Sequence, residues 1–136
     1  MMRIRPVDRY RYRDYLKRAQ ECANAMDRAY ETGEWNACVI NAVHCGVSAA
    51  DALCVATKGV HHAGERHGDA ISLLISIDPK DDEIKNISNR LSRLLGVKTG
   101  AEYGEKLMGA KDAEDAKRDA EKISDLVKGK LAKMGV

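Results

Sequence analysis

The segment 37-ACVINAVHCGVSAADALCVA-56 decides the fold of this chain. It is too long for a strand and rich in alanine, and apolar residues occur on nearly every side of the helix that it predicts. Gly33 precedes this segment and Gly59 follows it, as glycine commonly does at the end of a helix. We therefore predict a helix over residues 34–58 that lies buried at the centre of the protein.

One line of polar residues interrupts the apolar surface of this helix: Asn41, His44, Ser48 and Asp51. At about 100° per residue they fall within an arc of about 80° and share one face. Buried polar groups destabilise a protein unless they are paired, so other helices, water or a partner chain must satisfy them. His44 and Asp51 are a candidate acid–base pair, which would act through an intermediary because about two helical turns separate them. The alternative is a polar seam between helices or at a dimer interface.

The rest of the chain also predicts helices, from apolar positions spaced by three and four. They cover residues 8–31, residues 67–77, a stripe from Ile84 to Leu95 that Asp81 or Asp82 can cap, and residues 110–132. Residues 59–64 have the composition of a loop, and no segment alternates as a strand does. Three glycines between residues 96 and 104 predict a turn or kink, although close packing against another helix would also place glycines there. The sequence thus predicts one all-α domain over residues 1–136, an up-down bundle of four or five helices.

Positive charge is concentrated at the beginning of the chain. Residues 1–18 hold seven basic and two acidic residues, a net charge of +5, whereas the remainder holds sixteen basic and nineteen acidic residues. Three tyrosines lie among these cations, and a basic segment with aromatic residues is suited to binding phosphates and stacking on bases. Arg9 and Arg13 are the candidate binding residues here. The alternative is a solvated beginning of the first helix.

Other features of the sequence bear on the location of the protein, on the role of its cysteines and on cofactors. No apolar run reaches the ~18 residues that cross a membrane, and the first residues lack the apolar core of a secretory signal, so we expect a cytoplasmic protein without membrane contact. The four cysteines lack a Cys-x-x-Cys pairing, and we interpret them as core residues. His61, His62 and His67 do not have the spacing of a closed zinc site, and no glycine-rich phosphate loop follows a strand. We therefore predict no metal and no other cofactor.

The order of the segments carries a family resemblance. After the long first helix come NAVHCGVSAADAL at residues 41–53, a G-x-x-x-x-G-x-x-H spacing that leads into a short helix with two leucines, and RLSRLLGVKTGAEYG at residues 90–104. This order resembles the HEPN (higher eukaryotes and prokaryotes nucleotide-binding) family over nearly the whole chain. The resemblance implies a helical bundle that dimerises and has an RNA-related role. Many members are metal-independent ribonucleases, including phage-defence nucleases and toxins paired with small nucleotidyltransferases.

The sequence departs from this family at the catalytic motif. Active members carry an arginine, four to six residues, and then a histidine at the fourth helix, and two copies of this pair meet across the dimer. Here Lys98 and Tyr103 take the two positions, which resembles the degenerate branch of the family. Lysine can hold a phosphate but lacks the two-pronged fork of arginine. A tyrosine phenol ordinarily loses its proton near pH 10 and is a poor base at neutral pH.

We therefore expect a dimeric, non-catalytic HEPN-like domain that binds RNA, a nucleotide or a protein partner, for which a nucleotidyltransferase antitoxin is one candidate. The alternative is an endoribonuclease that acts as a toxin or phage-defence effector with a substitute for the missing pair. The candidate residues are Lys98, Tyr103, His44 and Asp51 for catalysis, and Asn41, Ser48, Arg66, His67, Arg9 and Arg13 for binding.

Overall fold

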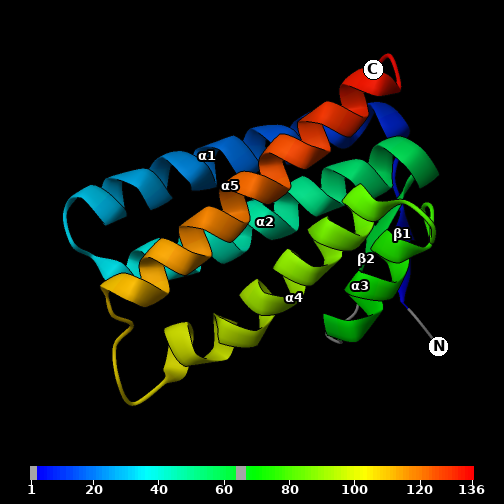
Figure 1. Ribbon diagram of the computed structural model, residues 1–136. Coiled ribbons are helices and arrows are strands. Elements are labelled where there is room, and N and C mark those ends of the chain that lie inside the picture. The colour runs from blue at the N-terminus through cyan, green and yellow to red at the C-terminus, as the bar shows by residue number, and fades with distance from the viewer. Residues whose placement is uncertain (1–2, 64–66) are drawn as a thin grey trace.

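A computed structural model describes residues 3–63 and 67–136, except for the side chain of His67. In these residues the chain forms five helices packed as a bundle, with a short 3-10 turn and two three-residue strands (Figure 1). The predicted helical bundle is confirmed. The helices are α1 (Tyr12–Glu31), α2 (Trp35–Lys58), α3 (His67–Ile75), α4 (Asp82–Tyr103) and α5 (Ala110–Lys133).

Helix α2 is the buried centre of the bundle, as its composition predicts. Helices α1, α4 and α5 pack against it, and fourteen of its residues are buried. At Gly59 the backbone takes the left-handed conformation (φ 67°), which glycine adopts without a steric penalty, and the helix ends there. In length and composition α2 is also capable of crossing a membrane, which corrects the expectation that no segment is. Most of that apolar surface is buried inside the bundle, as expected of a core helix.

Helix α4 continues through two of the glycines at which the sequence predicts a turn or kink. The carboxylate of Asp81 caps its beginning by accepting hydrogen bonds from two backbone N–H groups of the first turn. The helix ends only at Tyr103. Leu95 and Ala101, on either side of the glycines, are buried, and the side chain of Asn36 on α2 donates a hydrogen bond to the backbone oxygen of Ala101. Packing against α2 therefore outweighs the low helical propensity of glycine.

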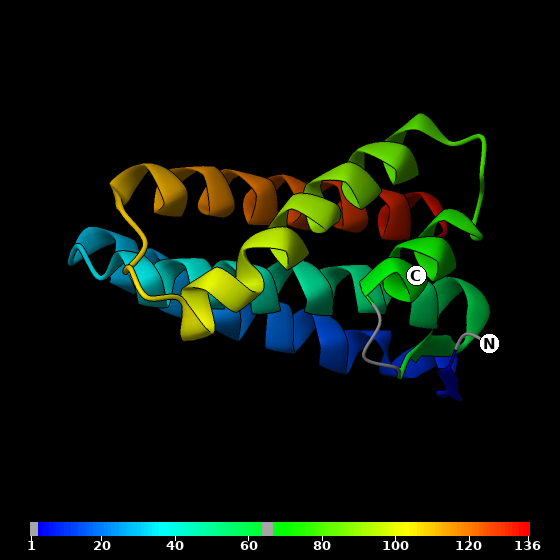
Figure 2. The same ribbon diagram turned by 90° about the horizontal axis from the view of Figure 1, so that it is seen from below.

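Two short strands lie at one end of the bundle, where the sequence predicts none. Strand β1 (Ile4–Pro6) pairs antiparallel with β2 (Val60–His62), so that Arg5 lies opposite His61. The prediction of a loop over residues 59–64 is therefore wrong for β2, because three residues are too few to show the alternation of a strand. The pairing holds the beginning of the chain against the connection between α2 and α3 (Figure 2).

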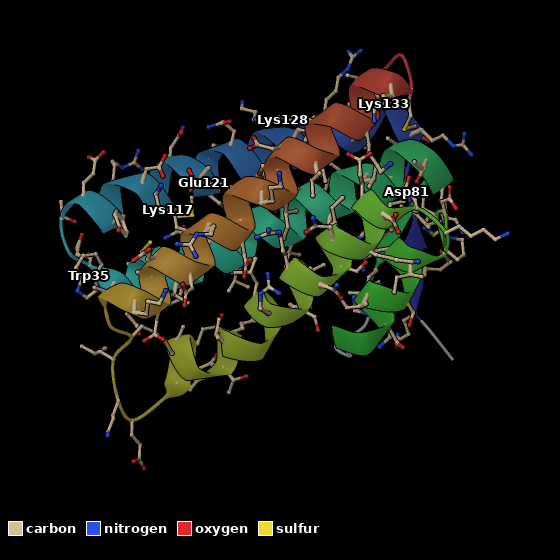
Figure 3. The ribbon with its side chains drawn as sticks, in the orientation of Figure 1. Trp35, Asp81, Lys117, Glu121, Lys128 and Lys133 are labelled. Carbon is tan, nitrogen blue, oxygen red and sulfur yellow. The ribbon has the colours of Figure 1, made fainter. Side chains whose placement is uncertain are left out.

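Helix α1 begins later than predicted and lies beside α5. Arg9–Arg11 form the 3-10 turn, and the α-helix follows at Tyr12. On the side of α5 that faces α1, the ammonium of Lys117 lies 3.7 Å from the carboxylate of Asp27 on α1 and 3.2 Å from that of Glu121 (Figure 3). The pair with Asp27 joins the two helices that cover one side of α2, whereas the pair with Glu121 lies within α5.

Candidate functional site

A cavity of about 700 Å³ lies between α2, α3, α4 and β2. Aliphatic side chains form much of its wall, among them Val47, Leu73, Leu91 and Leu95. Its polar residues are Asp51, His62, Lys98, Thr99, Glu102 and Tyr103. The structure thus brings together three of the predicted site residues, Asp51, Lys98 and Tyr103, which come from two different helices.

Asp51 lies in the second half of α2, in the part of the helix that faces α3 and β2. Burial raises the pKa of its carboxyl group to about 7, and the positive charge of Arg18 acts in the opposite direction. The group therefore changes charge near neutral pH, and it can donate a hydrogen bond as the acid or accept one as the carboxylate. The neighbouring Cys54 cannot supply a thiolate at that pH, because burial and the charge of Asp51 raise its pKa to about 12.

Helix α4 supplies the opposite wall of the cavity. Lys98 and Glu102 are four residues apart, so they lie one above the other on the same face of the helix. Lys98 forms no ion pair with a carboxylate in the described residues, which leaves its ammonium available to an anion. Tyr103, the last residue of the helix, is 81% exposed and lies at the rim of the cavity.

Strand β2 supplies a further residue that the sequence singled out only as part of a histidine cluster. Successive side chains of a strand point to opposite sides. His62 accordingly lines the cavity, whereas the ring of His61 packs against Tyr15 with 5.6 Å between ring centroids. The Nε2 atom of His62 is buried and has no hydrogen-bond partner among the described residues. Within the same residues, no group of three His, Cys, Asp or Glu side chains is placed to hold a metal ion.

The four polar residues along α2 lie in different environments. Asp51 reaches the cavity, but His44 is exposed and does not line it, so the structure does not bring His44 to Lys98. Asn41 donates a hydrogen bond to the backbone oxygen of Ala37 (2.9 Å), and Ser48 is buried. The difference arises because α3 and β2 meet the cavity at the level of Asp51, and helical periodicity cannot show where a covering element begins or ends.

The remaining predicted residues lie elsewhere. Arg66 is outside the described residues, and so is the side chain of His67. Arg9 and Arg13 are exposed at the beginning of the chain, away from the cavity lining. The guanidinium of Arg13 lies 5.8 Å from the centre of the Tyr12 ring, within the range of a cation–π contact.

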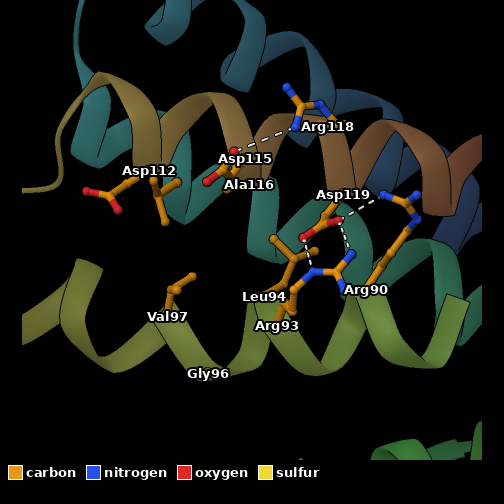
Figure 4. A pocket seen from close by; sticks show the side chains of 11 residues that line it. Arg90, Arg93, Leu94, Gly96, Val97, Asp112, Asp115, Ala116, Arg118 and Asp119 are labelled. Atoms are coloured by element: carbon orange, nitrogen blue, oxygen red, sulfur yellow. Dashed lines mark hydrogen bonds and ion pairs between the residues drawn. The ribbon is translucent and has the colours of Figure 1, made fainter. Parts of the chain in front are cut away.

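A second cavity, of about 590 Å³, lies between α4 and α5 (Figure 4). At its wall Asp119 of α5 is 7% exposed and accepts hydrogen bonds from Arg90 (3.0 Å) and Arg93 (2.7 and 3.0 Å) of α4. The carboxylate offsets one of the two positive charges, and a buried carboxylate requires such partners. We therefore assign this cluster to the packing of the two helices.

The sequence matches the HEPN domain family over residues 12–130. Because this match spans nearly the whole chain and the structure is a five-helix bundle, the protein belongs to the HEPN family. No curated protein matches the chain. The family resemblance that the segment order indicated is thereby confirmed.

Proposed function

We propose that this HEPN domain is a non-catalytic module that binds a nucleotide of an RNA in the cavity between α2 and α4. The observation that supports the proposal is the meeting of Asp51, Lys98 and Tyr103 at one cavity with aliphatic walls. Ligand sites typically combine an apolar lining with a few polar groups that fix orientation.

Each side chain suits one part of a nucleotide. The ammonium of Lys98 can hold phosphate oxygens as a point charge. Leu91 and Leu95 offer apolar surface to the base. Asp51 accepts from an amino group of the base as a carboxylate and donates to a ring nitrogen as the acid. Tyr103, exposed at the rim, can stack on a neighbouring base.

The same geometry favours binding over cleavage. Lys98 lacks the two-pronged fork with which arginine positions a phosphate. His44 lies outside the cavity, and the Nε2 atom of His62 is buried. The buried Nε2 atom of His62, the one histidine among the described residues that line the cavity, is therefore not placed to exchange a proton with a bound RNA.

The binding proposal is tested by calorimetry with the four 5′-ribonucleoside monophosphates in the presence of EDTA. We expect Lys98→Ala to weaken binding about tenfold or more, because the phosphate loses its cation. Lys122→Ala, which removes an exposed lysine of α5, is the matched control and should leave binding unchanged. If the protein binds none of the four nucleotides, or binds them equally well after Lys98→Ala, the cavity is not the nucleotide site.

One observation favours the ribonuclease alternative, namely the raised pKa of Asp51, because a general base acts best with a pKa near the working pH. Incubating the protein with a labelled single-stranded RNA in EDTA separates the two functions. We expect the RNA to remain intact. Cleavage that Asp51→Asn abolishes would instead show a nuclease that depends on the carboxyl group of Asp51.

We also propose that the domain functions as a homodimer. Toward the end of α4 and just after it three large apolar or aromatic residues are exposed to water, Val97 (38%), Tyr103 (81%) and Leu107 (83%), and burying such residues between two copies would be favourable. Light scattering at micromolar concentration should give twice the chain mass of 15.0 kDa, and Val97→Ser with Leu107→Ser should shift it toward one chain mass. A wild-type mass near 15.0 kDa would refute the dimer.

The nucleotidyltransferase partner and the cytoplasmic location stay predictions of the sequence.

A further inference from the structure

We propose that four residues beside the cavity, Arg5, Tyr15, Arg18 and His61, bind the phosphodiester and base next to the nucleotide in the cavity, so that the ligand is a single-stranded RNA of several nucleotides rather than a free nucleotide. We call these residues the β1–β2–α1 cluster. The inference rests on the proposed function, because it extends the same site along the strand.

The β1–β2 pairing builds one side of this cluster. Arg5 and His61 are cross-strand partners, and side chains of directly opposed residues point to the same face. On that face the His61 ring packs against Tyr15 of α1 at 5.6 Å and an interplanar angle of 50°. His62, the next residue of β2, points to the other side and lines the cavity. The strand is therefore the wall that the cluster and the cavity share.

Two arginines surround the aromatic pair. The guanidinium of Arg18 lies 5.4 Å from the centre of the Tyr15 ring. Burial lowers the pKa of His61, and the positive charges of Arg5 and Arg18 lower it further, which places both cations near the imidazole. Neither arginine forms an ion pair with a carboxylate of residues 3–63 or 67–136. Their charge is thus available to a phosphate.

The cluster is electrostatically close to Asp51. The pKa of Tyr15 is raised by burial first and then by the negative charge of Asp51. Conversely, the charge of Arg18 opposes the rise in the pKa of Asp51. Charges influence one another's pKa in this way only over short distances, up to about the Debye length of roughly 10 Å. In the proposed complex, the nucleotide next to the one in the cavity lies beyond β2, where it meets Tyr15 and Arg18.

The chemistry of the cluster matches single-stranded nucleic acid. Proteins that bind such strands combine cations that follow the backbone with aromatic rings on which successive bases stack. Exposed Arg9, Arg13 and Lys17 extend the positive charge over the same part of the chain. An acidic protein surface would use these cations as well, but it offers no planar base for the tyrosine and histidine rings.

The test is calorimetry with oligoadenylates of one, two, four and eight nucleotides. For the wild-type protein we expect affinity to rise about tenfold or more from one nucleotide to four, because the second phosphate and base reach the cluster. In the double variant Arg5→Ala and Arg18→Ala this rise should disappear, while the affinity for the mononucleotide stays within about twofold. The salt dependence of binding to the eight-nucleotide strand should also fall, by a slope of about 1 to 1.5.

Arg28→Ala is the matched control, because Arg28 is an arginine in the last turn of the same helix, away from the cluster. The variant Arg5→Lys and Arg18→Lys, which keeps both charges, should retain most of the affinity, and thermal unfolding shows whether each variant is folded. Affinity that does not depend on length but still needs Lys98 overturns this inference and leaves the cavity proposal standing. If affinity rises with length, loses this rise in the Arg5→Ala and Arg18→Ala variant, and is unchanged by Lys98→Ala, the cluster is supported and the cavity proposal is overturned.

Discussion

Gly46→Val is expected to lower the free energy of unfolding by about 3 kcal/mol, because it overpacks the centre of the bundle. Gly46 lies on α2 where α4 and α5 meet it: a β-carbon placed there would stand 2.6 Å from Cδ1 of Leu94 and 3.3 Å from Cδ1 of Ile123. Both side chains are fully buried and have little room to move. Urea unfolding followed by circular dichroism measures the change.

The control for this prediction is another glycine inside a helix. A β-carbon at Gly96 of α4 would meet no packed neighbour within 4 Å among the described residues. Gly96→Ala should therefore be neutral or should stabilise the protein by up to about 1 kcal/mol through helical propensity. If Gly46→Val and Gly96→Ala change the stability equally, the close approach of α2 to α4 and α5 is not as the structure describes.

Asp51→Asn is expected to gain stability relative to the wild-type protein by about 2–3 kcal/mol when the pH rises from 5 to 8. An aspartate in an unfolded chain loses its proton near pH 4, whereas burial in the folded protein raises the pKa of Asp51 to about 7. Between these values the folded protein holds a proton that the unfolded chain has lost. The stabilisation by the protonated group is therefore complete below about pH 4 and is lost as the pH rises through 7.

The size of this effect follows from about 1.4 kcal/mol for each pH unit over the roughly two units between pH 5 and 7. Asparagine has no proton to lose, so the difference between variant and wild type isolates Asp51 from every other titrating group. Asp125→Asn, which changes an exposed carboxylate of α5, should show no such trend. Parallel pH profiles of Asp51→Asn and the wild-type protein would mean that the carboxyl group is not buried.

Several parts of the fold can be read from local patterns. The apolar composition of residues 37–56 predicts the central helix, and Gly59 and Asp81 mark boundaries because their effects act within one turn. The glycines of α4 predict a turn or kink where the helix in fact continues, because a glycine also acts only on its own neighbourhood. Their local preference for a turn is small compared with the burial of Leu95 and Ala101, whose partners lie far away in the sequence.

In the candidate site, too, some residues can be predicted from the sequence and others only from the structure. Lys98 and Tyr103 are found through their place in the family motif, and Asp51 through its position on an otherwise apolar helix. His62 and Arg5 could not be assigned in this way, because β2 lies in an apparent loop and β1 in a charged segment. His44 shares the helical face of Asp51 but has a different exposure, since the helical angle does not reveal which elements cover the helix.

By itself, then, the sequence determined the helices, the central place of α2 and the family, because helical periodicity and segment order are properties of neighbouring residues. Only the tertiary structure decided that Asp51, Lys98 and His62 face one cavity and that Arg5 and His61 lie beside it. Burial, pairing across strands and the pKa of Asp51 depend on contacts between distant segments, and no local pattern encodes which segments will meet.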